Sequence, residues 1–247
     1  MKYAIISDIH ANLEALEAVL NDAKPQADAI VCLGDIVGYN ANPNECLYLV
    51  RCVCDVVITG NHDQAAVGLR PYDDFNDNAS AAIDWTRSHL TLAEQAYLRS
   101  LPLLARFGEY CLAAHGSPRD TDEYLVYATH FRQTFAYLQR HLPEVRCCFV
   151  GHTHLPMLWQ CTPEGLVSSV EIAPYTIPLD LTCRYIVNPG SVGQPRYGGP
   201  DASYVLLDEA ALTVEFRFVP YEVGITQEKI YDAGLPPYLA ERLAIGH

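Results

Sequence analysis

Five short apolar runs along the chain share one pattern, because each is followed closely by polar residues. The runs are continuous rather than alternating, which is typical of strands that are buried on both faces. The pattern comprises residues 3–7 before Asp8 and His10, residues 29–33 before Asp35, residues 55–59 before Asn61, residues 110–114 before His115, and residues 147–150 before His152 and His154. In open α/β sheets, ligands bind beyond the carboxyl ends of the strands. We therefore expect five strands to deliver these polar residues to one edge.

Helical periodicity appears between these runs. In residues 12–23, Leu13, Leu16, Val19 and Leu20 fall on one helical side, and the first sixty residues alternate strand and helix as in a βαβαβ unit. Thr91 is expected to cap a helix, with Glu94 completing a capping box. The other helices are expected at residues 43–52, 78–89, 92–100 and 129–141, and one or two short ones within residues 226–245.

The second half of the chain changes to short strands separated by Pro and Gly. They are expected at residues 157–161, 166–172, 185–187, 204–207 and 214–219. Such strands indicate a second, more antiparallel sheet packed on the first. The fold class predicted is α/β, a four-layer αββα sandwich of two mixed β-sheets flanked by helices. Residues 1–247 are expected to form one domain, because no linker divides them.

Composition narrows the range of partners. Half of the 247 residues are hydrophobic and 19% are charged, as in an ordinary globular domain. The net charge of −14 argues against binding of double-stranded nucleic acid, although bound cations can reverse the local field. Nine cysteines, mostly within apolar runs and without a Cys-x-x-Cys pair, indicate neither a disulfide framework nor a zinc site. With no apolar leader or membrane-length run, we expect a cytoplasmic protein that does not bind membranes.

The polar blocks resemble, in type and order, those of the calcineurin-like metallophosphoesterases. The blocks are Asp8-x-His10, Gly34-Asp35, Gly60-Asn61-His62-Asp63, His115 and Gly151-His152-x-His154. The resemblance covers almost the whole chain. Asn12 and the run from Asn188 to Gly193 further resemble the small prokaryotic phosphodiesterase-like branch of that family.

The resemblance implies two divalent metal ions that share Asp35. One ion would be held by Asp8, His10, Asp35 and His154, and the other by Asp35, Asn61, His115 and His152. Carboxylate, imidazole and amide ligands suit Mn, Fe, Co, Ni or Zn, and a carboxylate can bridge ions ~3.5 to 4 Å apart. A hydroxide between the metals would then attack phosphorus in line.

Four further residues are candidates for the chemistry around the metals. The resemblance implies that His62 protonates or hydrogen-bonds the leaving oxygen, and that Asp63 orients its imidazole. Arg196, in a glycine-rich loop, either binds phosphate or belongs to a tight turn, and Asn12 is a candidate for substrate binding. The acidic loop from Asp73 to Asp77 is expected to be a solvated loop rather than a cation site.

The expected function is a divalent-metal-dependent phosphoesterase, and a phosphodiesterase rather than a phosphatase. Ile36 follows Asp35, where related Ser/Thr phosphatases and symmetrical dinucleoside tetraphosphatases carry a phosphate-binding Arg. A phosphomonoesterase or dinucleoside polyphosphate hydrolase is an alternative, as is a non-catalytic metal-binding interaction scaffold. The expected substrate is a small phosphoester or a nucleotide-like molecule. The 16 tyrosines are compatible with a homodimer.

Overall fold

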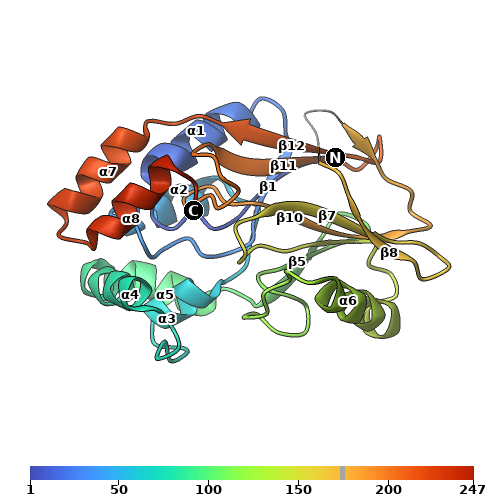
Figure 1. The fold of residues 1–247 in the computed structure, drawn as a ribbon, viewed down its shortest axis with the longest axis horizontal. Coiled ribbons are helices and arrows are strands. Elements are labelled where there is room, and N and C mark those ends of the chain that lie inside the picture. The colour runs from blue at the N-terminus through green and yellow to red at the C-terminus, as the bar shows by residue number, and fades with distance from the viewer. Residues whose placement is uncertain (173–175) are drawn as a thin grey trace.

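Two mixed six-stranded β-sheets pack face to face in the computed structural model, which describes residues 1–172 and 176–247 (Figure 1). The first sheet has the order β3-β2-β1-β11-β12-β9, with strands at Val56–Val57 (β3), Ala29–Cys32 (β2), Lys2–Ile6 (β1), Ala202–Asp208 (β11), Thr213–Val219 (β12) and Ile177–Pro178 (β9). The second sheet has the order β4-β5-β6-β10-β7-β8, with strands at Leu104–Phe107 (β4), Cys111–Ala114 (β5), Cys147–Phe149 (β6), Arg184–Pro189 (β10), Pro156–Cys161 (β7) and Val167–Val170 (β8).

Helices cover the outer faces of both sheets, which confirms the expected αββα sandwich. Figure 1 shows α1 above the strands and α6 below them. The helices are Leu13–Ala23 (α1), Pro43–Val53 (α2), Asn61–Ala66 (α3), Asp77–His89 (α4), Leu92–Ser100 (α5), Ala128–His141 (α6), Val223–Asp232 (α7), Pro237–Glu241 (α8) and the 3-10 turn Arg242–Ala244. None of the helices in the described ranges combines the length and hydropathy needed to cross a bilayer.

Strand β1 illustrates why the apolar runs are continuous. Ile5 belongs to the core between the sheets, where it shares a cluster with Phe149 of the second sheet. Ala4 and Ile6 belong instead to the core between the first sheet and its helices. Successive side chains of a strand point to opposite faces, and here both faces are covered. All three residues are therefore fully buried.

The helix positions agree closely with the sequence patterns. Helix α5 has the expected bounds, and Thr91 caps it by accepting a hydrogen bond from the Glu94 main-chain N at 3.2 Å. The Glu94 carboxylate does not complete a capping box but forms an ion pair with Arg51 at 3.3 Å. The sequence patterns did not anticipate three short elements, α3, β4 and β9.

The assignment of strands to sheets differs from expectation. Strands β11, β12 and β9 join the first sheet, because β11 pairs antiparallel with β1. Strands β5 and β6 belong to the second sheet, where β10 pairs parallel with β6. The polar strand ends therefore come from two sheets rather than from one edge of a single sheet. Pairing between strands about 200 residues apart is a tertiary choice that local periodicity does not encode.

Phe131 of α6 tests the packing of the helix layer on the second sheet. Its side chain is fully buried and stacks on Trp159 of β7, with ring centroids 4.2 Å apart. We expect Phe131→Ala to lower the free energy of unfolding by about 3 to 5 kcal/mol, because it leaves a cavity. Urea unfolding followed by tryptophan fluorescence would measure the loss. The control Leu92→Ala, at an 84% exposed position, should change stability by less than about 0.5 kcal/mol; equal effects of both changes would contradict this packing.

Candidate metal centre

The loops that follow five strand ends, from both sheets, bring the seven predicted ligands together. Asp8 and His10 follow β1, Asp35 follows β2, and Asn61 begins α3 just beyond β3. From the second sheet, His115 follows β5, and both His152 and His154 follow β6. All seven side chains are buried, the most exposed of them at 4%. A buried cluster of this composition requires compensating partners or bound cations.

The backbone at most of these residues is in the left-handed region. Five of the seven have φ between 48° and 67°, namely Asp8, His10, Asp35, His152 and His154. Such a conformation costs of order 1 to 3 kcal/mol per non-glycine residue and is typical of functional sites. Main-chain hydrogen bonds between the loops stabilise it, including His10 N to Asp35 O and Gly193 N to Asp8 O, both 2.9 Å. The loops thus hold one another in a strained geometry that aims the side chains inward.

The ligand atoms form two clusters that meet at Asp35. In the first, His154 Nε2 lies 3.3 Å from Asp8 Oδ1 and 3.2 Å from His10 Nε2. In the second, His115 Nε2 lies 3.1 Å from Asn61 Oδ1. Asp35 Oδ2 faces both clusters, at 3.6 Å from His10 Nε2 and 3.3 Å from His115 Nε2.

His152 completes the second cluster. Its ligand atom lies within 4.8 Å of those of Asp35 and His115, and its Nε2 is buried without a hydrogen-bond partner among the described residues. A buried imidazole nitrogen without a partner is costly, and a cation bound by the cluster would satisfy it.

Hydrogen bonds on the outer side of the rings fix the tautomers of three histidines. The Nδ1 atoms of His10, His115 and His154 lie 3.1, 2.8 and 2.6 Å from the main-chain oxygens of Val37, Leu33 and Gln194. Nδ1–H therefore donates to a carbonyl and Nε2 presents a lone pair to the cluster, as in metal-ligating histidines. The facing Nε2 atoms of His10 and His154 would repel each other without a cation between them. The donor set fits divalent metal ions.

Burial and mutual charge shift the pKa values of the ligands. Burial lowers the pKa of His152 to about 3 and that of His154 well below its usual value, which keeps both imidazoles neutral. At His115, burial also acts to lower the pKa, but the Asp35 carboxylate outweighs it and raises the value to about 10. Without a metal, His115 Nε2 therefore carries a proton that faces Asp35. A bound metal would displace that proton and take the Nε2 lone pair.

His62 lies beside the ligands without belonging to the set predicted for either metal. Its ring centroid is 4.8 Å from that of His10, 4.5 Å from Tyr39 and 4.7 Å from Phe75. Burial lowers the pKa of His62 to about 4, so the imidazole is neutral at neutral pH and carries a single N–H. Asp35 and His10 approach it closely enough for the three to form a further potential metal-binding group.

The structure corrects the expected role of Asp63. Its Oδ1 accepts hydrogen bonds from the main-chain N of Ile36 and Val37, at 2.8 and 3.1 Å, and its Oδ2 accepts one from Gly60 N at 3.0 Å. His62 Nδ1 has no hydrogen-bond partner within the described part of the chain. Asp63 therefore holds the loop after β2 against the start of α3, and does not orient the imidazole.

Asn12 is likewise a structural residue rather than a substrate ligand. It is fully buried and caps α1 by accepting a hydrogen bond from Ala15 N at 3.2 Å. Its amide nitrogen donates to Gly193 O at 3.0 Å, and its amide oxygen accepts from the Thr226 hydroxyl at 3.1 Å. These bonds join α1, the loop after β10 and α7, so Asn12 positions the loops around the metal centre.

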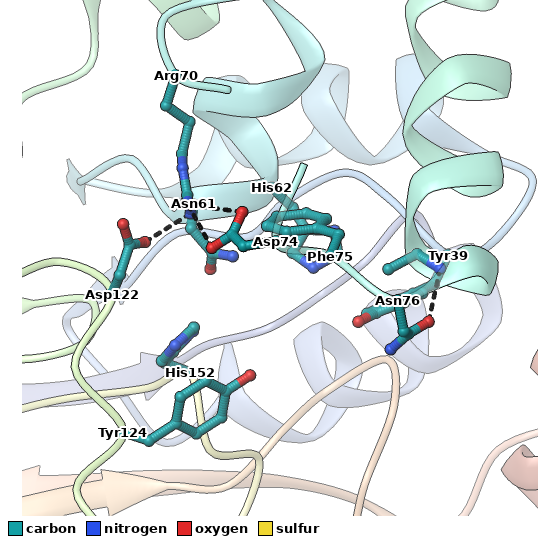
Figure 2. Close-up of a pocket in the computed structure, with 11 residues that line it drawn as sticks. Tyr39, Asn61, His62, Arg70, Asp74, Phe75, Asn76, Asp122, Tyr124 and His152 are labelled. Carbon is teal, nitrogen blue, oxygen red and sulfur yellow. Dashed lines mark hydrogen bonds and ion pairs between the residues drawn. The ribbon is translucent and has the colours of Figure 1, made fainter. Parts of the chain in front are cut away.

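A cavity of about 150 Å³ opens onto the metal centre (Figure 2). Asn61, His62 and His152 lie on its inner wall, and Figure 2 shows Arg70 reaching between two carboxylates. Arg70 pairs with Asp122 at 2.7 Å and with Asp74 at 3.1 Å. Asp74 belongs to the predicted acidic loop, which is exposed here apart from this ion pair.

Sequence patterns did not identify the other walls of this cavity. Tyr39, Phe75 and Tyr124 line it, and the ring of Tyr124 lies 3.9 Å from that of His152. Of these three, Tyr39 has the clearest signal in the sequence, because it stands four residues after the predicted ligand Asp35. Its backbone is left-handed, with φ of 62°. Arg196, predicted as a possible phosphate ligand, lines an adjoining cavity instead of this one.

Residues 1–211 match the model of the calcineurin-like phosphoesterase superfamily domain. The chain belongs to the calcineurin-like phosphoesterase superfamily. A protein of Methanocaldococcus jannaschii described as uncharacterized is 40% identical over 249 residues, covering 98% of this chain and 97% of its own.

Two solved structures share the fold of this chain. The crystal structure of a metallophosphoesterase from Sphaerobacter thermophilus has a TM-score of 0.85 and 40% sequence identity, and the alignment covers 100% of both chains. A hypothetical protein from Pyrococcus horikoshii has the same fold, with a TM-score of 0.79 at 22% identity over 100% of this chain and 98% of the other. This phosphoesterase therefore shares both its fold and nearly its full length with these proteins.

Substitution of Asp35 tests whether this residue is a ligand shared by both clusters. We expect Asp35→Ala to abolish metal binding at both clusters, because Oδ2 is the oxygen that faces both of them. Elemental analysis of protein purified without chelator would measure this, with Asp35→Asn as a variant of conserved shape and Asp73→Ala as an exposed control. Native metal content in both Asp35 variants would contradict a shared ligand.

Proposed function

We propose that this protein is a divalent-metal-dependent phosphodiesterase acting on small, nucleotide-like phosphoesters. The observation that carries the proposal is the position of Asp35 between two clusters of ligand atoms, with His62 beside them on the wall of an open cavity. Membership of the phosphoesterase superfamily supports the reaction class. Divalent cations bound there would neutralise phosphoryl oxygens and lower the pKa of water.

The protein's own residues would orient the reacting group and hydrogen-bond the leaving oxygen. His62 lines the cavity as a neutral imidazole, and its N–H can donate a hydrogen bond to the oxygen of the leaving group as the P–O bond breaks. Tyr39 and Phe75 both pack against this ring and restrict its movement. The imidazole is thus pre-positioned at the edge of the metal centre.

The charge of the cavity favours a diester over a monoester. Arg70 is its one guanidinium among the described lining residues, and Asp74 and Asp122 neutralise it. A phosphomonoester carries up to two negative charges at neutral pH, whereas a diester carries one, so the doubly charged group loses more by approaching these carboxylates. Ile36 also leaves the site without an arginine next to Asp35.

Aromatic side chains at the entrance suit a nucleotide-like ester. Tyr39, Phe75 and Tyr124 line the cavity, and Tyr124 is 47% exposed. Flat aromatic faces beside a few polar groups are typical of pockets that bind planar rings. A base or another aromatic alcohol of the ester would stack there while the phosphoryl group lies at the metal centre.

Hydrolysis of bis-p-nitrophenyl phosphate tests the proposal directly. The native protein supplied with Mn²⁺, Fe²⁺, Co²⁺, Ni²⁺ or Zn²⁺ should cleave this diester with a higher kcat/KM than p-nitrophenyl phosphate. Chelation, or the Asp35→Ala change, should abolish turnover because the ligand set is lost. Bound metal without cleavage of either ester would favour a non-catalytic scaffold, and faster cleavage of the monoester would favour a phosphatase.

The role of His62 can be tested with Gly38. A Cβ at Gly38 would lie 2.6 Å from His62 Nδ1, so Gly38→Ala should displace the imidazole while leaving the metals in place. We expect His62→Ala to slow diester hydrolysis by ~10² to 10⁴, and Gly38→Ala to slow it in the same direction. Steady-state kinetics with parallel metal analysis would measure both.

Gly165→Ala is the matched control for Gly38→Ala. Gly165 has a similar backbone, with φ of 84° against 93°, but a Cβ there meets nothing within 4 Å. The Gly165→Ala variant should therefore carry the same kind of backbone strain as Gly38→Ala without a steric clash, and it should keep native turnover. Normal kinetics in both His62→Ala and Gly38→Ala would overturn the assignment of His62.

A further inference from the structure

A second cavity adjoins the opening of the metal centre. Its volume is about 470 Å³, and it shares Tyr39, Asn76 and Tyr124 with the first cavity. Its remaining lining residues are Asp77, Asn78, Arg196, Tyr238 and Arg242. The two cavities therefore lie next to each other, so groups of one ligand can reach both.

The two arginines of this second cavity differ from Arg70 because neither forms an ion pair with an Asp or Glu side chain among the described residues. Arg196 donates from Nη2 to Gln194 Oε1 at 2.9 Å, and its Nε is buried without a partner in the described ranges. Arg242 donates from Nε to the main-chain oxygen of His247. Its two Nη groups form no hydrogen bond with any described residue. Two half-buried guanidinium groups thus keep unused donors in a protein of net charge −14.

The fold brings these arginines together from distant parts of the chain. Gly198 N donates to Gly246 O at 3.0 Å, which ties the loop after β10 to the C-terminal segment. A Cβ at Gly246 would lie 2.1 Å from Gly199 O, so the two segments are in close contact. Leu239 and Leu243, on either side of Arg242, pack in one cluster with Ala79 of α4. The packing of these segments therefore fixes where both arginines lie.

The electrostatics of the cavity favour an anion. Arg196 and Arg242 line the same cavity. In agreement with this, burial and then the charge of Arg196 lower the pKa of Arg242. The first turn of α4 lines the same space and adds a partial positive charge. Asp77, the one carboxylate in the described lining, pairs with neither arginine.

We propose that Arg196 and Arg242 form a subsite for a second phosphate group of the substrate, apart from the phosphoryl group that reacts at the metal centre. A phosphate oxygen is the acceptor that fits planar guanidinium donors best. This inference rests on the proposed function and narrows it. The substrate class is a phosphodiester that carries an additional phosphate, such as a nucleotide ester phosphorylated at a second position.

Two matched esters test the subsite by kinetics. They are the p-nitrophenyl ester of thymidine 5′-phosphate and the same ester with an added 3′-phosphate, measured with native protein in Mn²⁺. We expect the phosphorylated ester to have a kcat/KM roughly tenfold or more higher, the usual value of a charge-assisted hydrogen bond. The ratio should fall toward one in Arg242→Gln and Arg196→Gln, and should recover in part in Arg242→Lys. Arg140→Gln, an exposed change on α6, should keep the native ratio.

Calorimetry separates failure of the subsite from failure of the enzyme assignment. Native protein should bind thymidine 3′,5′-bisphosphate or thymidine 5′-diphosphate roughly tenfold or more tightly than thymidine 5′-phosphate, and Arg242→Gln should lose that preference. Selective binding without any ester hydrolysis would refute the proposed function but support the subsite.

Three results would overturn the subsite. One is equal binding of all three nucleotides by native protein, and another is an unchanged preference in both arginine variants. The third is an equal gain when thymidine 5′-phosphate is supplied together with free inorganic phosphate, since this would mean that the subsite takes a separate anion rather than a group of the substrate.

Discussion

The Asp35 carboxylate is the interaction on which the rest of the centre depends. Its Oδ2 faces His10 of one cluster and His115 of the other, while Oδ1 accepts a hydrogen bond from His62 N at 2.8 Å. One side chain therefore joins both clusters and anchors the helix that carries His62. The approach is so close that a Cβ at Gly60 would lie 2.1 Å from Oδ1, which explains a glycine at that position.

Burial of this carboxylate constrains the surrounding backbone. The ligand loops adopt left-handed conformations that are unfavourable for non-glycine residues, and main-chain hydrogen bonds between neighbouring loops hold them there. Asp63 and Asn12 take part in this scaffold, each through hydrogen bonds that join separate segments. Polar residues near the metals thus fall into two groups, those that face the clusters and those that keep the loops in place.

Substrate selection depends on a different part of the molecule from the metal chemistry. The ligands stand at the ends of core strands, whereas the cavity walls come from the loop around Phe75, the loop around Tyr124 and the C-terminal segment with Arg242. Such segments can vary while the centre is kept, and a fold by itself does not specify a substrate. The two cavities differ in charge. Arg70 in the first is paired with carboxylates, whereas Arg196 and Arg242 in the second keep free donors.

The sequence by itself determined the strand ends, most helices and the set of residues that meet at the centre, because these depend on local periodicity and on short ordered motifs. Only the tertiary structure decided that β5 and β6 lie in the other sheet from β1, since strand pairing is a long-range choice. It also decided that Asp63 binds the main chain and that Arg242 stands beside Arg196. A side chain's partners depend on which distant segments pack against it, and no pattern along the chain records that.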